Sequence, residues 1–157
     1  MFVRRLLLAG LLALFIAPLG AWAADVTPAQ AAETLRSSLL RAQLDLARDP
    51  QSSQAALATA RSAYDSALAP SLEAAAPAEA ARIAGAWDSA GAALAAGDAP
   101  AFAGARARIW TGVLGGSYRL VEQALAAGDG ATAQRWLALR EFRVATRFSR
   151  PAADATL

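Results

Sequence analysis

The residues best suited to chemistry in this sequence are four arginines that follow a tryptophan near the C-terminal end. The set is Trp136, Arg140, Arg143, Arg147 and Arg150. On an α-helix, which turns by about 100° per residue, all five would fall within roughly 80° of one another. A guanidinium group pairs bidentately with carboxylate or phosphate and stacks on aromatic rings. We call this set the arginine stripe and expect it to pack against a group that supplies carboxylates or phosphate.

The arginine stripe would lie between two apolar edges of such a helix. These edges consist of Leu137, Val144 and Phe148 on one side and Leu139 and Phe142 on the other. A charged face that only meets solvent is not expected in that position. The matching acids either belong to this chain, in which case the stripe ties helices together, or belong to a partner. Because structural ion pairs also order such groups, the sequence leaves both alternatives open.

The last third of the chain also carries a family resemblance. The segments concerned are residues 109–118 (IWTGVLGGSY), 126–129 (AAGD), 136–143 (WLALREFR), 146–151 (TRFSRP) and 153–157 (ADATL). Together they resemble the exported N-terminal region of bacterial Ftr-type high-affinity iron permeases, which are related to the fungal oxidase-coupled iron permease. The resemblance is specific in this third and extends to the remainder only in general character.

The resemblance implies an extracytoplasmic helical domain that assists iron uptake across the inner membrane. The transport function of the family rests on a multi-helix membrane domain with Arg-Glu-x-x-Glu motifs. Residues 140–144 read REFRV and lack the second Glu, so we expect the transport domain to lie outside this chain, after residue 157. The implied partners are that membrane permease domain, in cis, or a periplasmic iron-delivery protein. A free-standing periplasmic protein-interaction module remains the alternative.

Metal and catalytic chemistry within this chain have little support. Iron(III) is a hard ion that takes carboxylate and phenolate oxygens, and Tyr118 and Glu122 lie four residues apart on one predicted helix face. They are weak metal candidates. The chain has no His and no Cys, which excludes imidazole or thiolate metal sites and His-dependent catalysis. We expect no enzyme and no cofactor in this chain, with iron implied only by the resemblance.

The N-terminal residues 1–23 are typical of a secretory signal peptide. Arg4 and Arg5 precede twelve apolar residues, and Ala21 and Ala23 occupy the positions that signal peptidase reads. The alternative interpretation is an uncleaved membrane anchor. Twelve apolar residues span only about 18 Å as a helix, which is shorter than the hydrocarbon core of a bilayer. Cleavage would leave residues 24–157 as one periplasmic domain, attached to the inner membrane if a permease domain follows. Without Arg4 and Arg5, acidic and basic residues are equal in number, so we expect no nucleic-acid partner.

Alanine dominates the mature sequence and favours helix, so we predict an all-α, antiparallel bundle of about five helices. Four helix starts are predicted, by Thr27 with Gln30 as a capping box, and by Asp49, Asp98 and Asp129. Ion pairs at helical spacing are predicted for Glu79 with Arg82 and for Asp45 with Arg41 or Arg48. The predicted core residues are Leu35, Leu39, Ala42, Leu46, Leu57, Ala60, Tyr64, Ala67 or Leu68, Ile83, Trp87, Ala90, Leu94, Phe102, Ile109, Val113 and Leu120.

Three further features of the sequence bear on helix boundaries. Pro70 and Pro77 bracket a short connection. Gly112, Gly115 and Gly116 interrupt a long predicted helix, and we expect a kink or break near the last two rather than a close approach of another helix. Residues 93–98 and 124–129 both read ALAAGD. This repeat indicates either a reused helix-turn-helix junction, which we favour, or a short helical-repeat scaffold.

Overall fold

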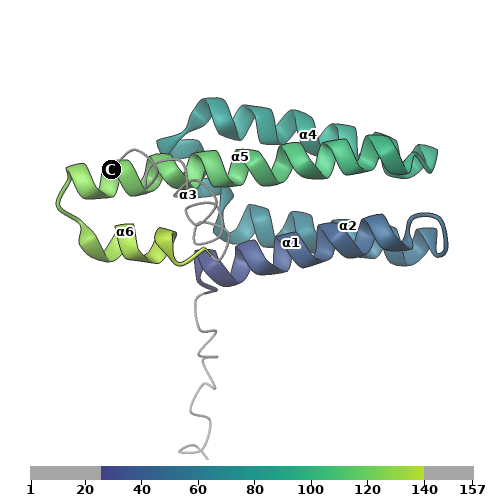
Figure 1. The fold of residues 1–157 in the computed structure, drawn as a ribbon, viewed down its shortest axis with the longest axis horizontal. Coiled ribbons are helices and arrows are strands. Elements are labelled where there is room, and N and C mark those ends of the chain that lie inside the picture. The colour runs from purple at the N-terminus through teal and green to yellow at the C-terminus, as the bar shows by residue number, and fades with distance from the viewer. Residues whose placement is uncertain (1–25, 140–157) are drawn as a thin grey trace, which may run out of the picture.

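The computed structural model describes residues 26–139, and within that range it contains six α-helices and no strand (Figure 1). The helices are α1 (Pro28–Asp45), α2 (Pro50–Ala67), α3 (Ala69–Ala75), α4 (Pro77–Ala96), α5 (Ala99–Ala126) and α6 (Gly130–Leu137). The predicted all-α fold is therefore confirmed. The additional helix is α3, which occupies the segment predicted as a connection between Pro70 and Pro77. The predicted signal peptide and the four arginines of the stripe lie outside the described residues.

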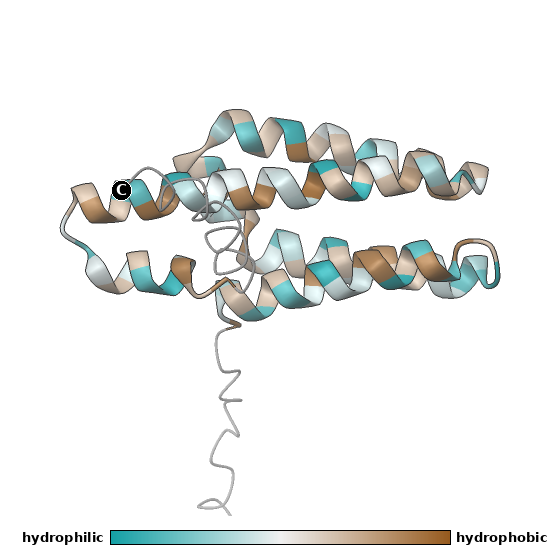
Figure 2. Cartoon of the chain, viewed as in Figure 1, coloured by the Kyte–Doolittle hydropathy of each residue, from teal (hydrophilic) through white to brown (hydrophobic). Residues whose placement is uncertain are grey.

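Two antiparallel helix pairs form the two layers of the bundle (Figure 1). The first pair is α1 with α2, and the second is α4 with α5. Helix α3 lies between the layers and contacts α2, α4 and α5. Helix α6 folds back along α5, and it contacts α1 at the end where the described chain begins. Polar and apolar residues are interspersed along the helices, as Figure 2 shows. No helix between residues 26 and 139 is both long and apolar enough to span a bilayer.

The predicted helix starts are confirmed by side-chain caps. Thr27 accepts a hydrogen bond from the Gln30 amide, and Gln30 Oε1 accepts one from the Thr27 amide at 3.0 Å, which completes the capping box. Asp49, Asp98 and Asp129 each accept from a backbone amide three residues later. Each of these carboxylates satisfies an N–H group that the helix itself leaves without a partner.

The two ALAAGD segments form the same junction. In the first, the Asp98 amide donates to Ala93 O at 2.9 Å, and Gly97 has a left-handed φ of 67°. In the second, the Asp129 amide donates to Ala124 O at 2.8 Å, and Gly128 has a φ of 72°. Both are Schellman endings followed at once by an Asp cap. Because α4, α5 and α6 contain 20, 28 and 8 residues, the sequence repeats a junction and not a pair of helices.

The core contains most of the residues predicted for it. Those that are buried are Leu35, Leu39, Ala42, Leu46, Ala60, Tyr64, Leu68, Ile83, Trp87, Ala90, Phe102, Ile109 and Val113. Leu57, Ala67, Leu94 and Leu120 are only partly buried and pack against this cluster. Leu72 and Leu139 are fully buried although the sequence did not single them out as core residues. Leu72 was missed because its segment was not predicted to be a helix.

The predicted break near Gly115 and Gly116 is wrong, because α5 is continuous from Ala99 to Ala126. The glycines instead allow close packing. A Cβ atom on Gly112 would lie 2.5 Å from Cγ1 of Ile83, and one on Gly116 would lie 2.5 Å from Cδ2 of Leu72. At Gly112, α4 therefore approaches α5 more closely than a residue with a side chain would allow, whereas at Gly116 the atom in the way is a terminal methyl group of Leu72 on α3. This contact fixes the α4–α5 pair, on which the groove described next is built.

Candidate functional site

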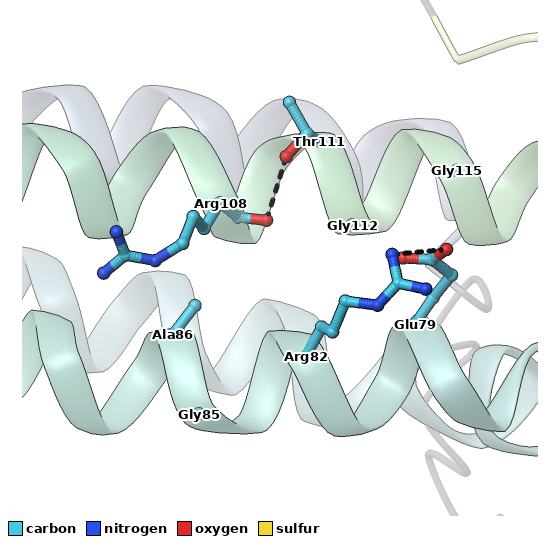
Figure 3. Close-up of a pocket in the computed structure, with 8 residues that line it drawn as sticks. All are labelled: Glu79, Arg82, Gly85, Ala86, Arg108, Thr111, Gly112 and Gly115. Atoms are coloured by element: carbon cyan, nitrogen blue, oxygen red, sulfur yellow. Dashed lines mark hydrogen bonds and ion pairs between the residues drawn. The ribbon is translucent and has the colours of Figure 1, made fainter.

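A surface groove with a volume of about 370 Å³ lies between α4 and α5 (Figure 3). We call it the α4–α5 groove. Glu79 and Arg82 stand at one end of it, and the Arg108 side chain extends toward the other end. Ala86 and Gly112 lie between these charged groups, and Gly115 lies beside Glu79 (Figure 3). The groove thus combines charged ends with a middle that has little side-chain bulk.

Glycine creates the space in this groove. A Cβ atom on Gly85 would meet no atom within 4 Å, so this position opens directly into free volume. A Cβ on Gly115 would lie 3.6 Å from Cδ of Glu79, which is an ordinary van der Waals contact. Larger side chains at these two positions would occupy the groove. The close approach at Gly112 holds its two walls together, because Ile83 of α4 packs directly on the α5 backbone there.

The electrostatics of the α4–α5 groove favour anions. Glu79 and Arg82 form the predicted ion pair, with Nη1 and Oε1 3.1 Å apart. Within the part of the chain that the structure describes, Arg108 makes no ion pair, and its side chain is exposed. The Thr111 hydroxyl donates to the carbonyl of Ala107 at 2.9 Å. Two guanidinium groups against one carboxylate leave a net positive groove, which suits an oxyanion.

A second, smaller hollow of about 160 Å³ lies between α1 and α5. Arg36, Leu39, Arg106 and Trp110 line it. The Nε atom of Arg106 is buried without a hydrogen-bond partner, whereas Arg36 pairs with Glu33 at 2.8 Å. A buried N–H group without an acceptor is destabilising, and this one belongs to a residue that lines the hollow. The sequence did not reveal it, because Arg106 has the spacing of any surface arginine on a helix.

Comparison with known protein families identifies the family of this chain. The family model described as the iron permease FTR1 N-terminal domain matches residues 24–157. The chain belongs to this family. No curated protein and no solved structure matches it. Family membership confirms the resemblance seen in the sequence and gives the chain an iron permease-related role, in a family of transporters.

In this FTR1 N-terminal domain, the first residue of the arginine stripe belongs to the core. Trp136 lies in the last turn of α6 and is 3% exposed, and Leu139 just after it is fully buried. Leu137, predicted to flank the stripe, is 42% exposed. Helix α6 ends at Leu137, so the described residues do not continue a helix from Trp136 toward the arginines. Arg140, Arg143, Arg147 and Arg150 lie outside the described residues.

The weak metal candidates of the FTR1 N-terminal domain lie on the surface of α5. Tyr118 is 51% exposed, and Glu122 forms an ion pair with Arg119 at 2.9 Å. Within residues 26–139, no group of three or more His, Cys, Asp or Glu side chains is placed to hold a metal ion. Tyr118 and Glu122 therefore have no third acidic ligand beside them in that range.

The predicted ion pair of Arg41 with Asp45 is present, with Nε and Oδ2 3.4 Å apart.

Proposed function

We propose that this chain is the extracytoplasmic domain of an FTR1-type iron permease and that it assists iron uptake across the inner membrane. The observation that carries the proposal is the family match, which extends over residues 24–157. The match begins directly after the predicted signal-peptide cleavage site at Ala23, which supports an exported domain. The iron is cargo of the whole protein in this proposal, and the chain itself is not an enzyme.

The proposed assistance consists of contacts and not of iron ligation by this domain. The described surface has a cationic groove and scattered ion pairs, and among its residues no cluster of three potential metal ligands is present. Arginine-rich surfaces suit recognition of carboxylates on another protein segment. The proposed partners are the membrane permease domain, in cis, or a periplasmic iron-delivery protein, with the four arginines of the arginine stripe, Arg140, Arg143, Arg147 and Arg150, as one of the contact surfaces.

The proposal is tested by radioactive iron uptake in cells that depend on the native protein for iron. Deletion of the sequence encoding residues 26–139, with the signal peptide kept, should strongly reduce uptake while the remaining protein still reaches the membrane. Unchanged uptake by a correctly located deletion protein would refute the proposal. A free-standing interaction module, the alternative, would be supported if the chain purified from the periplasm as a separate protein of the mass expected for residues 24–157.

The location is tested with a single introduced cysteine. The chain has no native Cys, and Leu125 is 61% exposed, so Leu125→Cys would provide the one reactive thiol of this domain. A membrane-impermeant maleimide added to intact spheroplasts should label it as fully as in lysed cells. The buried position Val113 serves as the control, because Val113→Cys should stay unlabelled until the protein is denatured. Labelling only after lysis would exclude the extracytoplasmic location.

The role of the arginine stripe is tested by the double substitution of Arg140→Gln with Arg143→Gln. If the stripe contacts a partner, iron uptake falls while thermal unfolding of the domain stays unchanged. If its acids are internal and buried, the unfolding temperature falls strongly, because one half of a buried ion pair is left alone. Arg119→Gln is the matched control, since Arg119 forms an exposed pair that contributes little to stability. No change in either measurement would remove the stripe from the proposal.

A further inference from the structure

We infer that the α4–α5 groove is a binding site for a small anion that carries two carboxylate groups. One carboxylate would pair with Arg108 and the other with Arg82 (Figure 3). The inference goes beyond the proposed function and does not depend on it, because it concerns binding by this domain in the absence of iron.

Arg108 supplies the first contact. Its guanidinium group extends along the groove, and it makes no ion pair with any residue in the described range. Five N–H donors are therefore available in a planar fork, which matches the two oxygens of a carboxylate. The other arginines of α4 and α5 differ from it. Arg82 and Arg119 are paired with Glu79 and Glu122, and the Nε atom of Arg106 is buried.

Arg82 supplies the second contact, positioned by Glu79. The Glu79 side chain is 23% exposed and holds Nη1 of Arg82 at 3.1 Å, whereas the Arg82 side chain is 70% exposed. The carboxylate thus anchors one edge of the guanidinium at the groove and leaves further N–H groups directed to solvent. A charge-assisted hydrogen bond from those groups to a second carboxylate needs no rearrangement of the ion pair.

The shape of the groove selects an extended anion over a compact one. The guanidinium groups of Arg82 and Arg108 extend in opposite directions (Figure 3), so a compact phosphate at one of them would be remote from the other. The stretch between them is bordered by Gly85, Ala86 and Gly112, which leaves room for a short carbon chain. The volume of about 370 Å³ suits a ligand of small-metabolite size.

The test is isothermal titration of the whole chain with succinate, acetate and inorganic phosphate at low ionic strength, where screening is weakest. We expect saturable binding of succinate, at least about tenfold tighter than that of either other anion, since losing one charge-assisted pair costs about one to two orders of magnitude in affinity. Absence of saturable succinate binding up to about 10 mM would overturn the inference. Phosphate or acetate binding as tight as that of succinate would also overturn it.

Two matched pairs of variants locate the site. Arg108→Gln should weaken succinate binding at least about tenfold, whereas Arg119→Gln on the same helix should leave it unchanged. Gly85→Leu should block the groove, whereas Gly91→Leu, at an equally open position of α4 outside it, should not. Unfolding curves check that each variant is folded. If either control weakens binding as much as its partner variant, the anion binds elsewhere and the inference is wrong.

Discussion

The substitution Gly112→Ala tests the packing of α4 on α5, which shapes the groove. In an exposed helix position, Gly→Ala stabilises a protein by up to about 1 kcal/mol, because alanine has the higher helix propensity. At Gly112, the added Cβ would lie 2.5 Å from Cγ1 of Ile83, and both residues are buried. That atom is close to the Ile83 backbone and belongs to a stiff β-branched side chain. Relief therefore requires the two helices to separate.

The expected magnitude follows from the difference between matched variants. Overpacking by a methyl group typically costs about 1–3 kcal/mol. Gly115→Ala, one turn further along α5, adds the same methyl group at an ordinary contact distance of 3.6 Å. The propensity gain is common to both variants, so Gly112→Ala should be less stable than Gly115→Ala by about 1–3 kcal/mol. For a domain of this size, that difference corresponds to a shift in Tm of roughly 4–12 °C.

Urea and thermal unfolding, followed by circular dichroism, measure this difference. Gly91→Ala on α4, where a Cβ meets nothing within 4 Å, gives the propensity gain alone and should match Gly115→Ala. The stability of Gly116→Ala should lie between those of Gly112→Ala and Gly115→Ala. The Cβ at this position would meet the terminal methyl group Cδ2 of Leu72, which can rotate away. If Gly112→Ala is as stable as Gly91→Ala, the close approach of α4 to α5 is not a constraint, and our account of the groove walls fails.

Three further predictions concern individual side chains. The hydrogen bonds from Thr132 hold the pKa of the Asp129 carboxyl below its ordinary value. The ionised carboxylate therefore stabilises the fold at neutral pH, and this stabilisation is lost as pH falls through the lowered pKa. Asp129→Ala should lower Tm at pH 7 and make no difference to Tm in strong acid. Burial, and to a smaller extent the charge of Glu73, raises the pKa of Tyr64. The free energy of unfolding should therefore fall once pH exceeds the pKa of a tyrosine in the unfolded chain, about 10. Tyr64→Phe should remove much of this loss of stability at alkaline pH. Arg106→Met removes an unsatisfied buried Nε and should leave urea stability unchanged or raise it by up to about 1 kcal/mol; a clear loss would mean that Arg106 has a partner.

Local sequence signals predicted the helix boundaries well, because each depends on only a few neighbouring residues. Thr27 with Gln30, and the aspartates at positions 49, 98 and 129, cap helices where the sequence placed them. Gly97 takes the left-handed conformation that a helix ending requires. These features were predictable since a cap is an interaction between residues three positions apart.

Features that depend on packing between distant segments were not predictable. Gly112 and Gly116 signal weak helix propensity in the sequence, and only the positions of Ile83 and Leu72 show that they serve as contact points. The α4–α5 groove was missed for the same reason, because Arg82 and Arg108 come to line one groove only when the α4–α5 hairpin forms. The family assignment was available from the sequence, since it depended on a run of specific residues in the last third.

The return of α6 to the beginning of α1 has a mechanical consequence. The described chain enters and leaves the bundle at adjacent points, where the end of α6 contacts the start of α1, and the α1–α2 and α4–α5 turns lie together at a distant end of the bundle (Figure 1). A tether attached at residue 26 or at residue 139 would therefore hold the bundle at one place, and the bundle would pivot there as a rigid body. The same adjacency of ends makes the domain suited to circular permutation, with a new opening at the distal α1–α2 turn.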